Sequence, residues 1–265
     1  MHHNPAAQLW CRLWPAPICG TAWVCPSGGR LVELSIVIPA LNEAAKIAAD
    51  VRAANQFLRC HNLTGEVIVV DDGSTDATAA NAQDAGATIV VRLEKTRGKG
   101  AAVRAGVARS AGRFVLFADS GSCVPFDDCL RGLEMIRAGE CDIAHGSRRH
   151  PDSVIVRPQP MRRRLLSRLF REAAGLLLPL PPRLRDTQCG FKVYRGEIAR
   201  DLFGHCTTDG FLFDLELILL ARKRGLRLAE FPIHWACDPD SRLHTGRSAP
   251  GLLRQLLALR HLHVS

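Results

Sequence analysis

Aromatic side chains are scarce in this chain of 265 residues, where they make up 6% of the sequence and include a single tyrosine. Proteins that hold single-stranded nucleic acid stack its bases on aromatic rings. We therefore expect no nucleic-acid partner, although the formal net charge is +9. Long apolar runs are missing as well. The longest candidate, residues 173–180, falls far below the roughly 18 residues of a membrane-spanning helix, so we expect no such helix.

Metal-binding cysteine patterns are also missing. The ten cysteines include no C-x-x-C pair and no zinc-like spacing. Cys60, Cys129 and Cys141 fall in or beside predicted elements, at positions where a small core residue fits. We interpret the cysteines as the reduced thiols of a cytosolic protein.

The first thirty residues lack the basic start and the unbroken apolar centre of a secretory signal. Three tryptophans, Trp10, Trp14 and Trp23, stand there among prolines. We predict an irregular N-terminal extension over residues 1–32 and one domain over residues 33–262. With 47% hydrophobic residues, a domain of that length can bury a full core.

The most informative pattern that is present is a repeated one, in which a short apolar run ends in a polar, loop-forming cluster. It occurs at residues 34–38, 66–70 and 113–118. Such runs, separated by helical stretches, predict a parallel α/β sheet. Further strands are expected at 87–92, 141–145 and 226–231, and helices at 44–58, 101–110, 161–178, 210–224 and 250–262. Two more helices are expected to begin at Pro125 and near Thr75, the latter capped by Ser74 or Thr75.

Polar side chains follow three of the predicted strands. Asn42 and Glu43 follow the first strand, Asp71 and Asp72 the second, and Asp119 the strand that begins at residue 113. Ligands of a parallel α/β sheet bind beyond the carboxyl ends of its strands. This acidic mouth favours a nucleotide held by base and ribose contacts, with a cation at its phosphates. An NAD-dependent oxidoreductase is disfavoured, because P-A-L-N-E-A rather than G-x-G-x-x-G follows the first strand.

A basic segment lies in the second half of the chain. Residues 157–171 hold six arginines and no acid, and Leu165, Leu166, Leu169 and Phe170 interleave with them. A solvated helix face would have this charge, but the interleaved apolar residues are typical of a helix that lies on a membrane surface. We predict an anionic membrane surface as a partner.

Several motifs together resemble a known family. Pro39-x-x-Asn42-Glu43, Val70-Asp71-Asp72-Gly73-Ser74-x-Asp76, Gly98-Lys99-Gly100 with Arg104, and the strand ending at Asp119 are similar to family 2 glycosyltransferases of the GT-A fold. The later blocks resemble the polyprenyl-phosphate sugar transferases: Gly146-Ser147-Arg148, Arg163 with Ser167, D-T-Q-C-G-F-K at 186–192, and Phe213-Asp214-x-Glu216-Leu217. The 186–192 block and Ser241-Arg242 are most similar to the dolichyl-phosphate β-glucosyltransferase branch.

This resemblance implies a GT-A α/β fold, with a mostly parallel central sheet flanked by helices and with amphipathic surface helices. It implies inverting transfer of a hexose, preferably glucose, from a nucleotide-diphosphate sugar to a polyprenyl or dolichyl phosphate. The reaction would occur at the cytosolic face of a membrane, with the protein peripherally attached. The site residues carried over are Pro39, Asn42, Glu43, Asp71, Asp72, Lys99 and Arg104 for the nucleotide sugar, Arg148, Arg163, Ser167 and Lys192 for the acceptor phosphate, and Asp119 and Asp186 for catalysis.

Each assignment has a structural alternative. Asn42 and Glu43 fit a helix N-terminus, Asp71 and Asp72 fit a turn, and Lys99 and Arg104 fit a charged surface. Glu216 fits a buried ion pair as well as a functional role.

The chain departs from the family at Asp119. The family usually carries Asp-x-Asp, which holds Mg²⁺ or Mn²⁺ against the donor diphosphate, whereas this chain reads Asp119-Ser120-Gly121. One carboxylate, waters and substrate phosphates are a normal set of ligands for Mg²⁺, and Ser122 or Gln188 could add an oxygen. We predict a Mg²⁺ or Mn²⁺ site at Asp119, which Gly121→Asp would complete. The alternative is a catalytically impaired protein that binds nucleotide sugars.

Overall fold

The computed structural model describes residues 31–238 and 249–264. The N-terminal extension before residue 31, Ser241-Arg242 and most of the polar loop before the last helix lie outside the described residues. The chain divides into two units, Met1–Leu31 and Val32–Ser265, and all the elements below belong to the second unit. The division of the chain at residue 32 into an extension and a domain stays a prediction.

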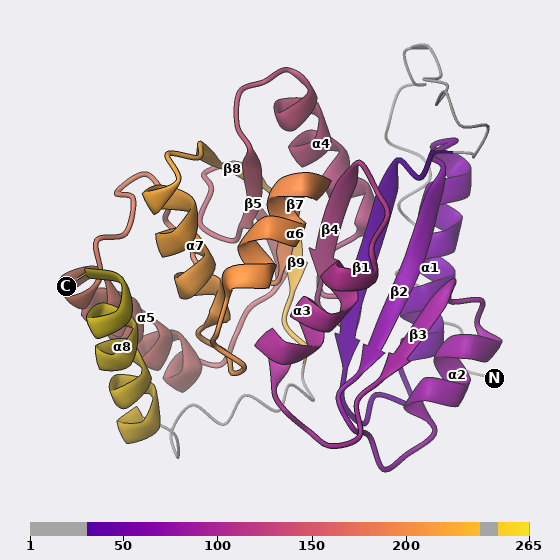
Figure 1. Cartoon of the computed structure of the whole chain (residues 1–265), viewed down its shortest axis with the longest axis horizontal. Coiled ribbons are helices and arrows are strands. Elements are labelled where there is room, and N and C mark those ends of the chain that lie inside the picture. The colour runs from indigo at the N-terminus through magenta and orange to yellow at the C-terminus, as the bar shows by residue number, and fades with distance from the viewer. Residues whose placement is uncertain (1–30, 239–248, 265) are drawn as a thin grey trace. The chain divides into compact units, whose positions relative to one another are not determined.

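A seven-stranded sheet forms the centre of this unit (Figure 1), in the order β3-β2-β1-β4-β7-β5-β8. Its strands are β1 (Leu34–Ala40), β2 (Gly65–Asp71), β3 (Ile89–Arg92), β4 (Phe114–Ala118), β5 (Ile143–Ser147), β7 (Phe191–Arg195) and β8 (Leu228–Pro232). All pairings are parallel except those of β7, which is antiparallel to both β4 and β5. The mostly parallel sheet predicted from the sequence is confirmed.

Strand β7 and helix α6 (Gly196–His205) were not predicted, because they lie where the sequence reads as irregular. The strand F-K-V-Y-R carries Lys192 at its second position, which argues against a buried strand. In the structure Lys192 is completely buried and its ammonium lies 2.5 Å from Asp214 Oδ1. The ion pair is what lets a charged residue occupy the middle of the sheet.

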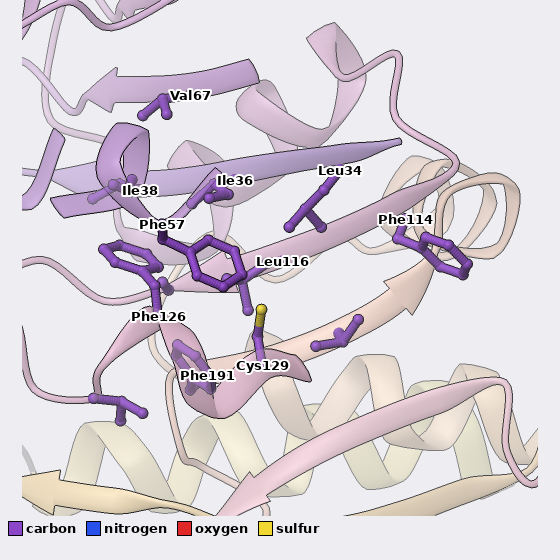
Figure 2. Packing of buried hydrophobic residues seen from close by; sticks show 14 of the residues in the cluster. Leu34, Ile36, Ile38, Phe57, Val67, Phe114, Leu116, Phe126, Cys129 and Phe191 are labelled. Atoms are coloured by element: carbon purple, nitrogen blue, oxygen red, sulfur yellow. The ribbon is translucent and has the colours of Figure 1, made fainter. Parts of the chain in front are cut away.

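One face of the sheet is covered by α1 (Ile47–Cys60), α2 (Thr78–Asp84) and α4 (Cys129–Arg137), which follows the 3₁₀ turn η3 (Phe126–Asp128). Helix α1 buries Ile47, Val51, Ala54 and Leu58, an apolar stripe with helical spacing. Figure 2 shows Phe57 of this helix beside Phe126, with ring centroids 6.3 Å apart. Each such fully buried apolar side chain stabilises the fold by about 1.5–3 kcal/mol.

The other face is covered by α3 (Lys99–Arg109), α6 and α7 (Phe213–Lys223), which lie on the viewer's side of the sheet in Figure 1. Phe117 of β4 meets Phe213 edge to face, with ring centroids 5.7 Å apart. Because these helices pack against β1, β2 and β4, they fix the loops at the carboxyl ends of those strands.

Two amphipathic helices lie side by side beyond the sheet, α5 (Met161–Leu177) and α8 (Ala249–Val264). They share a small apolar cluster with α7 that includes Ala174, Leu215 and Leu256. Within residues 31–238 and 249–264, no helix combines the length and the apolar character needed to cross a lipid bilayer. The short strands β6 (Val154–Arg157) and β9 (His234–Ala236) form a separate parallel pair.

Candidate active site

The loops after β1 and β2 are tied together at the carboxyl edge of the sheet. Asn42, whose φ of 49° is left-handed, accepts a hydrogen bond at Oδ1 from the backbone N–H of Thr75 at 2.8 Å. Its own N–H donates to Ser74 Oγ at 2.7 Å. Ser74 and Thr75 therefore hold Asn42. The prediction that one of them caps α2 is wrong. That helix begins at Thr78, whose N–H donates to Asp76 Oδ1 at 3.0 Å.

Asp71 and Asp72 are both buried but have different partners. Asp72 accepts the N–H groups of Arg97 and Gly98 at 2.8 and 2.9 Å, one on each carboxylate oxygen, and so fixes the start of α3. Asp71 accepts the N–H of Ser74 at Oδ1. Its buried Oδ2 takes no hydrogen bond from the described residues, and Arg92 Nε lies 3.5 Å away. Of the two residues, Asp71 therefore has a carboxylate oxygen, Oδ2, that can still accept a hydrogen bond.

Asp119 follows β4 and forms an ion pair with Lys99 at the start of α3. Lys99 Nζ lies 2.7 Å from Asp119 Oδ1 and 3.0 Å from Oδ2. Burial lowers the pKa of Lys99, but Asp119 and then Asp214 outweigh it, so the pKa is raised and the ammonium persists. Gly190 makes this position of Asp119 possible, because a Cβ at residue 190 would fall 2.1 Å from Asp119 Oδ2.

The turn after Asp119 has a glycine where the family motif has its second carboxylate. Gly121 has a left-handed φ of 91°. Asp50 of α1 accepts the N–H of Gly121 at 2.8 Å and the hydroxyl of Ser122 at 2.6 Å. A Cβ at residue 121 would lie 3.1 Å from Asp238 Oδ2. Gly121→Asp would therefore meet backbone strain and a like charge, both of which count against the expectation that it restores a two-carboxylate site.

A cavity lies beside Asp119 and is lined by residues from both halves of the chain. Lys99, Asp119 and Ser122 line it on the side of β4, and Arg148, Arg163 and Gln188 line it from the second half of the chain. Gln159, Trp235 and Asp238 complete its polar and aromatic lining. Burial raises the pKa of the Cys123 thiol in this cavity to about 12, and the charges of Asp119 and Asp238 add to the effect.

Arg148 points into the cavity and is held there by Asp186. Its Nε and Nη2 donate to the two oxygens of Asp186 at 2.6 and 2.7 Å, and its backbone N–H donates at 3.0 Å. The guanidinium also lies 5.5 Å from the Trp235 ring centroid. Burial raises the pKa of Asp186, but Arg148 lowers it more, so the pKa falls below its ordinary value and the group stays ionised. Such a bidentate pair fixes both position and charge.

Comparison with known proteins identifies the family. The model described as "Glycosyl transferase family 2" matches residues 35–203, more than half of the chain. The chain belongs to glycosyl transferase family 2. It is similar to the dolichyl-phosphate beta-glucosyltransferase of Drosophila melanogaster, at 34% identity over 228 residues, 80% of this chain and 69% of that protein. The human protein of the same name is 33% identical over 227 residues, with the same shares of both chains. The protein is therefore a glycosyltransferase.

Solved structures agree on the fold. Glucosyl-3-phosphoglycerate synthase from Mycobacterium tuberculosis in complex with UDP superposes with a TM-score of 0.65 at 24% identity, covering 94% of this chain and 86% of that one. The same enzyme with Mn²⁺, UDP-glucose and phosphoglyceric acid gives a TM-score of 0.64 at 23% identity, with shares of 87% and 79%. The predicted GT-A fold is confirmed.

Of the thirteen predicted site residues, Lys99, Asp119, Arg148 and Arg163 line the cavity. Asn42, Glu43, Asp71 and Asp72 lie at or just beyond the ends of β1 and β2 and are not among the lining residues.

Four further residues also lie outside the lining. Lys192 is 0% exposed and donates to the Cys189 carbonyl and Asp214, so it braces the cavity floor and does not meet an acceptor. Arg104 donates to the Cys206 carbonyl and pairs with Asp209. Pro39 is buried within β1. Ser167 lies one turn beyond Arg163 on α5, half-buried.

Asp186 also needs correction as a catalytic residue. It is 3% exposed, is not among the described residues that line the cavity, and has both oxygens engaged by Arg148. The geometry makes it a positioning residue.

Glu216 has a structural role. The sequence had left this role and a functional one open. Its carboxylate accepts the N–H groups of Thr207 and Thr208 at 3.0 and 2.7 Å, together with the Thr207 hydroxyl. Burial raises its pKa, but these hydrogen bonds dominate and lower the pKa to about 2. It anchors the loop before α7, and His263 of α8 lies 3.3 Å from Oε1.

Sequence reasoning missed Lys46, Asp50, Gln159, Trp235 and Asp238. Asp50 carried a signal, since it sits on the apolar stripe of α1, three residues after Ile47. Trp235 and Asp238 carried none, because they lie in and just after the short strand β9 and reach the cavity only through the tertiary fold.

The donor set of the cavity fits a hard divalent cation. Asp119 Oδ1 is buried, and its ion-pair partner there is Lys99 Nζ at 2.7 Å. Asp119 and Gln188 bring oxygen ligands to the same cavity. No group of three His, Cys, Asp or Glu side chains gathers as a metal cluster in the described part of the chain. Few protein ligands are normal for Mg²⁺, which relies on substrate phosphates and water.

Proposed function

We propose that the protein transfers a hexose from a nucleotide-diphosphate sugar to a polyprenyl or dolichyl phosphate, with inversion. UDP-glucose is the preferred donor. Support for the acceptor and the sugar comes from the dolichyl-phosphate beta-glucosyltransferases that the chain resembles at 33–34% identity. Mg²⁺ or Mn²⁺ is the proposed cofactor, in keeping with the donor set of the cavity.

One observation carries the proposal, namely that the 186–192 segment contacts both Arg148 and Asp119, two residues that line the cavity. Asp186 holds the guanidinium of Arg148, and Gly190 leaves room for the carboxylate of Asp119. The segment thus holds Arg148 in the same cavity as the pair Lys99–Asp119, and Arg163 of α5 lines that cavity too. A site that must bring two phosphorylated substrates together needs this arrangement.

On the donor side, Asp71 Oδ2 is a buried acceptor suited to the N3–H of uracil, which cytosine lacks. Asn42 and Glu43 lie at the adjacent strand end, near enough in the chain to serve the ribose. Lys99 stays charged and lies at the cavity wall, where it offsets negative charge that develops on the leaving diphosphate.

On the acceptor side, Arg148 and Arg163 bind the lipid phosphate. The second pKa of a phosphate monoester is about 6, so near neutrality its oxygen is already anionic. That oxygen forms the new bond to the anomeric carbon, while the bond from this carbon to the diphosphate oxygen breaks and its electron pair leaves with the nucleoside diphosphate. No proton has to be removed, which agrees with the ion-paired state of Asp186.

The divalent cation, when bound, neutralises the diphosphate of the donor and so improves it as a leaving group. Asp119 and Gln188 are the residues that would hold it. Equal turnover in EDTA or in Asp119→Asn would contradict this assignment.

Helix α5 provides a means of meeting the lipid at the cytosolic face of a membrane. Leu165 and Leu169 are 60% and 54% exposed, and Arg162 and Arg164 beside them are exposed too. Apolar side chains flanked by arginines insert between anionic headgroups. Leu253 and Leu257 of the neighbouring α8 extend the apolar surface.

The test is transfer of radiolabelled sugar to dolichyl phosphate from UDP-glucose, GDP-mannose and UDP-N-acetylglucosamine, each with Mn²⁺. Transfer from UDP-glucose well above the other two is expected, and no transfer from any donor would contradict the proposal. Gly121 favours one competing function, a nucleotide-sugar-binding protein with impaired catalysis. Metal-dependent binding of UDP-glucose without transfer or hydrolysis would establish that alternative.

A further inference from the structure

We infer that Asp238 supplies the second carboxylate of the divalent-cation site, in the place left by the side chain that Gly121 lacks. The inference rests on the proposed function, since it concerns the same cation. It assigns a ligand from the far end of the chain, 119 positions after Asp119 by the numbering of the two residues.

The first argument is the position of the carboxylate. A Cβ built on Gly121 would lie 3.1 Å from Asp238 Oδ2 and 3.5 Å from its Cγ. The Asp238 carboxylate therefore lies in close contact with the point at which a side chain at residue 121 would begin. Asp50 holds this turn by accepting the Gly121 N–H and the Ser122 hydroxyl. A carboxylate from another segment thus lies next to the position of the missing side chain.

The second argument is that Asp238 shares a cavity with the other oxygen ligands. Asp119, Gln188 and Asp238 all line the cavity that receives Arg148 and Arg163. Two carboxylates and an amide oxygen in one cavity form a donor set that suits Mg²⁺ or Mn²⁺ completed by substrate phosphate and water. Asp119 alone would leave the cation with a single charged protein ligand.

The third argument is that each of the two carboxylates is already paired with a positive charge, the ammonium group of a lysine. Lys99 Nζ lies on Asp119, and Lys46 Nζ contacts both oxygens of Asp238 at 2.9 Å. Lys46 also lies 3.8 Å from Glu43 Oε2, at the donor loop. A lysine ammonium sits on a flexible four-carbon stem, so it can leave the carboxylate when a divalent cation takes its place.

The competing explanation is that the Lys46–Asp238 ion pair only fastens the end of β9 to α1. The two explanations predict opposite effects for Lys46→Met. If the pair is structural, removing Lys46 harms the site as much as removing Asp238. If Asp238 is a ligand, removing Lys46 removes one competitor of the divalent cation for its carboxylate.

The experiment measures Mn²⁺ binding by electron paramagnetic resonance with UDP present, in the full chain and in single variants. Asp238→Asn is expected to weaken Mn²⁺ binding at least tenfold, as Asp119→Asn does. Lys46→Met is expected to bind Mn²⁺ as tightly as the wild type or more tightly. The matched control is Asp84→Asn, which removes one negative charge at the exposed end of α2 and should leave binding unchanged. Melting temperatures confirm that each variant is folded.

The outcomes separate this inference from the proposed function. If the wild type binds no Mn²⁺ with UDP, the metal-dependent donor site itself fails. If the wild type binds Mn²⁺ and Asp119→Asn does not, but Asp238→Asn binds like Asp84→Asn, the donor site stands and only the role of Asp238 is overturned. Equal weakening in Lys46→Met and Asp238→Asn would overturn it too, in favour of a structural ion pair.

Discussion

Gly190 and Asp119 lie so close together that a single methyl group at residue 190 would collide with the carboxylate. The colliding atoms are the far end of a side chain, 2.1–2.3 Å from the added Cβ, so Asp119 can turn away without unfolding the chain. A displacement of about 1 Å at a reacting site can cost about a hundredfold in rate. The geometry of the donor site therefore depends on the absence of a side chain at residue 190.

We predict that Gly190→Ala keeps the fold but lowers transfer from UDP-glucose about 10–100-fold. The loss arises from the broken Lys99–Asp119 pair and from weaker metal binding. Initial rates and far-UV circular dichroism measure the two effects. Gly204→Ala is the matched control, since an added Cβ there has no neighbour within 4 Å. Equal rates in the two variants would show that the position of Asp119 is unimportant.

Glu216 gives a prediction for stability. Glu216→Gln should lower the free energy of unfolding at pH 7 by about 1–3 kcal/mol, because buried N–H groups lose a charged acceptor. The folded-state pKa of about 2 lies below the ordinary value of 4.5. The stabilisation by the wild-type carboxylate is therefore complete above pH 4.5 and is lost as the pH falls towards 2.

The difference between wild type and Glu216→Gln should accordingly shrink as the pH falls below 4.5. Urea unfolding of both proteins at pH 7, 5, 4 and 3 measures it. Glu140→Gln, at an exposed position after α4, controls for the change of charge. A difference that grew at acid pH would contradict the sign.

At the scale of single residues, the sequence predicted the side chains whose role depends on the strand they follow. Asp71, Asp119 and Arg148 lie at strand ends, as expected. The partners of Asp186 and Lys192 could not be predicted, because a motif shows which residues occur together but not which of them faces the cavity. In this site the buried residues Asp186 and Lys192 hold residues that line the cavity.

At the scale of elements, α5 combines the two functions that we propose for it on one helix. Arg163 lines the cavity, while Arg162 and Arg164 are exposed beside Leu165 and Leu169. The amphipathic pattern predicted this helix to within one residue of its bounds. The strand β7 was not predicted, since no local pattern reveals that the charge of Lys192 is neutralised by Asp214 on α7.

We predict that Arg162→Glu with Arg164→Glu weakens co-sedimentation with anionic liposomes at least about tenfold, since each arginine contributes about 1 kcal/mol near the surface. Donor affinity should stay unchanged, because neither residue lines the cavity. Arg52→Glu with Arg59→Glu makes the same charge change on exposed positions of α1. If the control pair weakens binding as much, α5 is not the docking helix. Lost UDP-glucose affinity in the α5 variant would instead place its arginines at the donor site.

At the scale of the whole molecule, the cavity is assembled from segments that begin at Lys99 and end at Asp238. A ligand that contacts several of these segments stabilises all of them against unfolding. Saturation at a hundred times the dissociation constant adds about 2.7 kcal/mol. This corresponds to a rise in melting temperature of roughly 5–10 °C for a domain of this size.

We therefore predict that UDP with Mn²⁺ raises the melting temperature of the wild type by roughly 5–10 °C. UDP with EDTA should raise it far less, and Asp119→Asn should remove the metal-dependent part. Differential scanning fluorimetry measures these shifts without relying on turnover. An equal shift with EDTA would mean that the nucleotide binds without a divalent cation.

The antiparallel strand β7 also has a consequence for synthesis of the chain. Both strands of the β1–β4 pair are made by residue 118, whereas the other edge of β4 has no partner until Phe191–Arg195 has been made. β5 waits for the same five residues before it joins the sheet. An open edge invites pairing with other chains. A ribosome that stalls between residues 150 and 190 would thus hold a nascent chain with an unprotected β4, in which chaperone binding should be strongest.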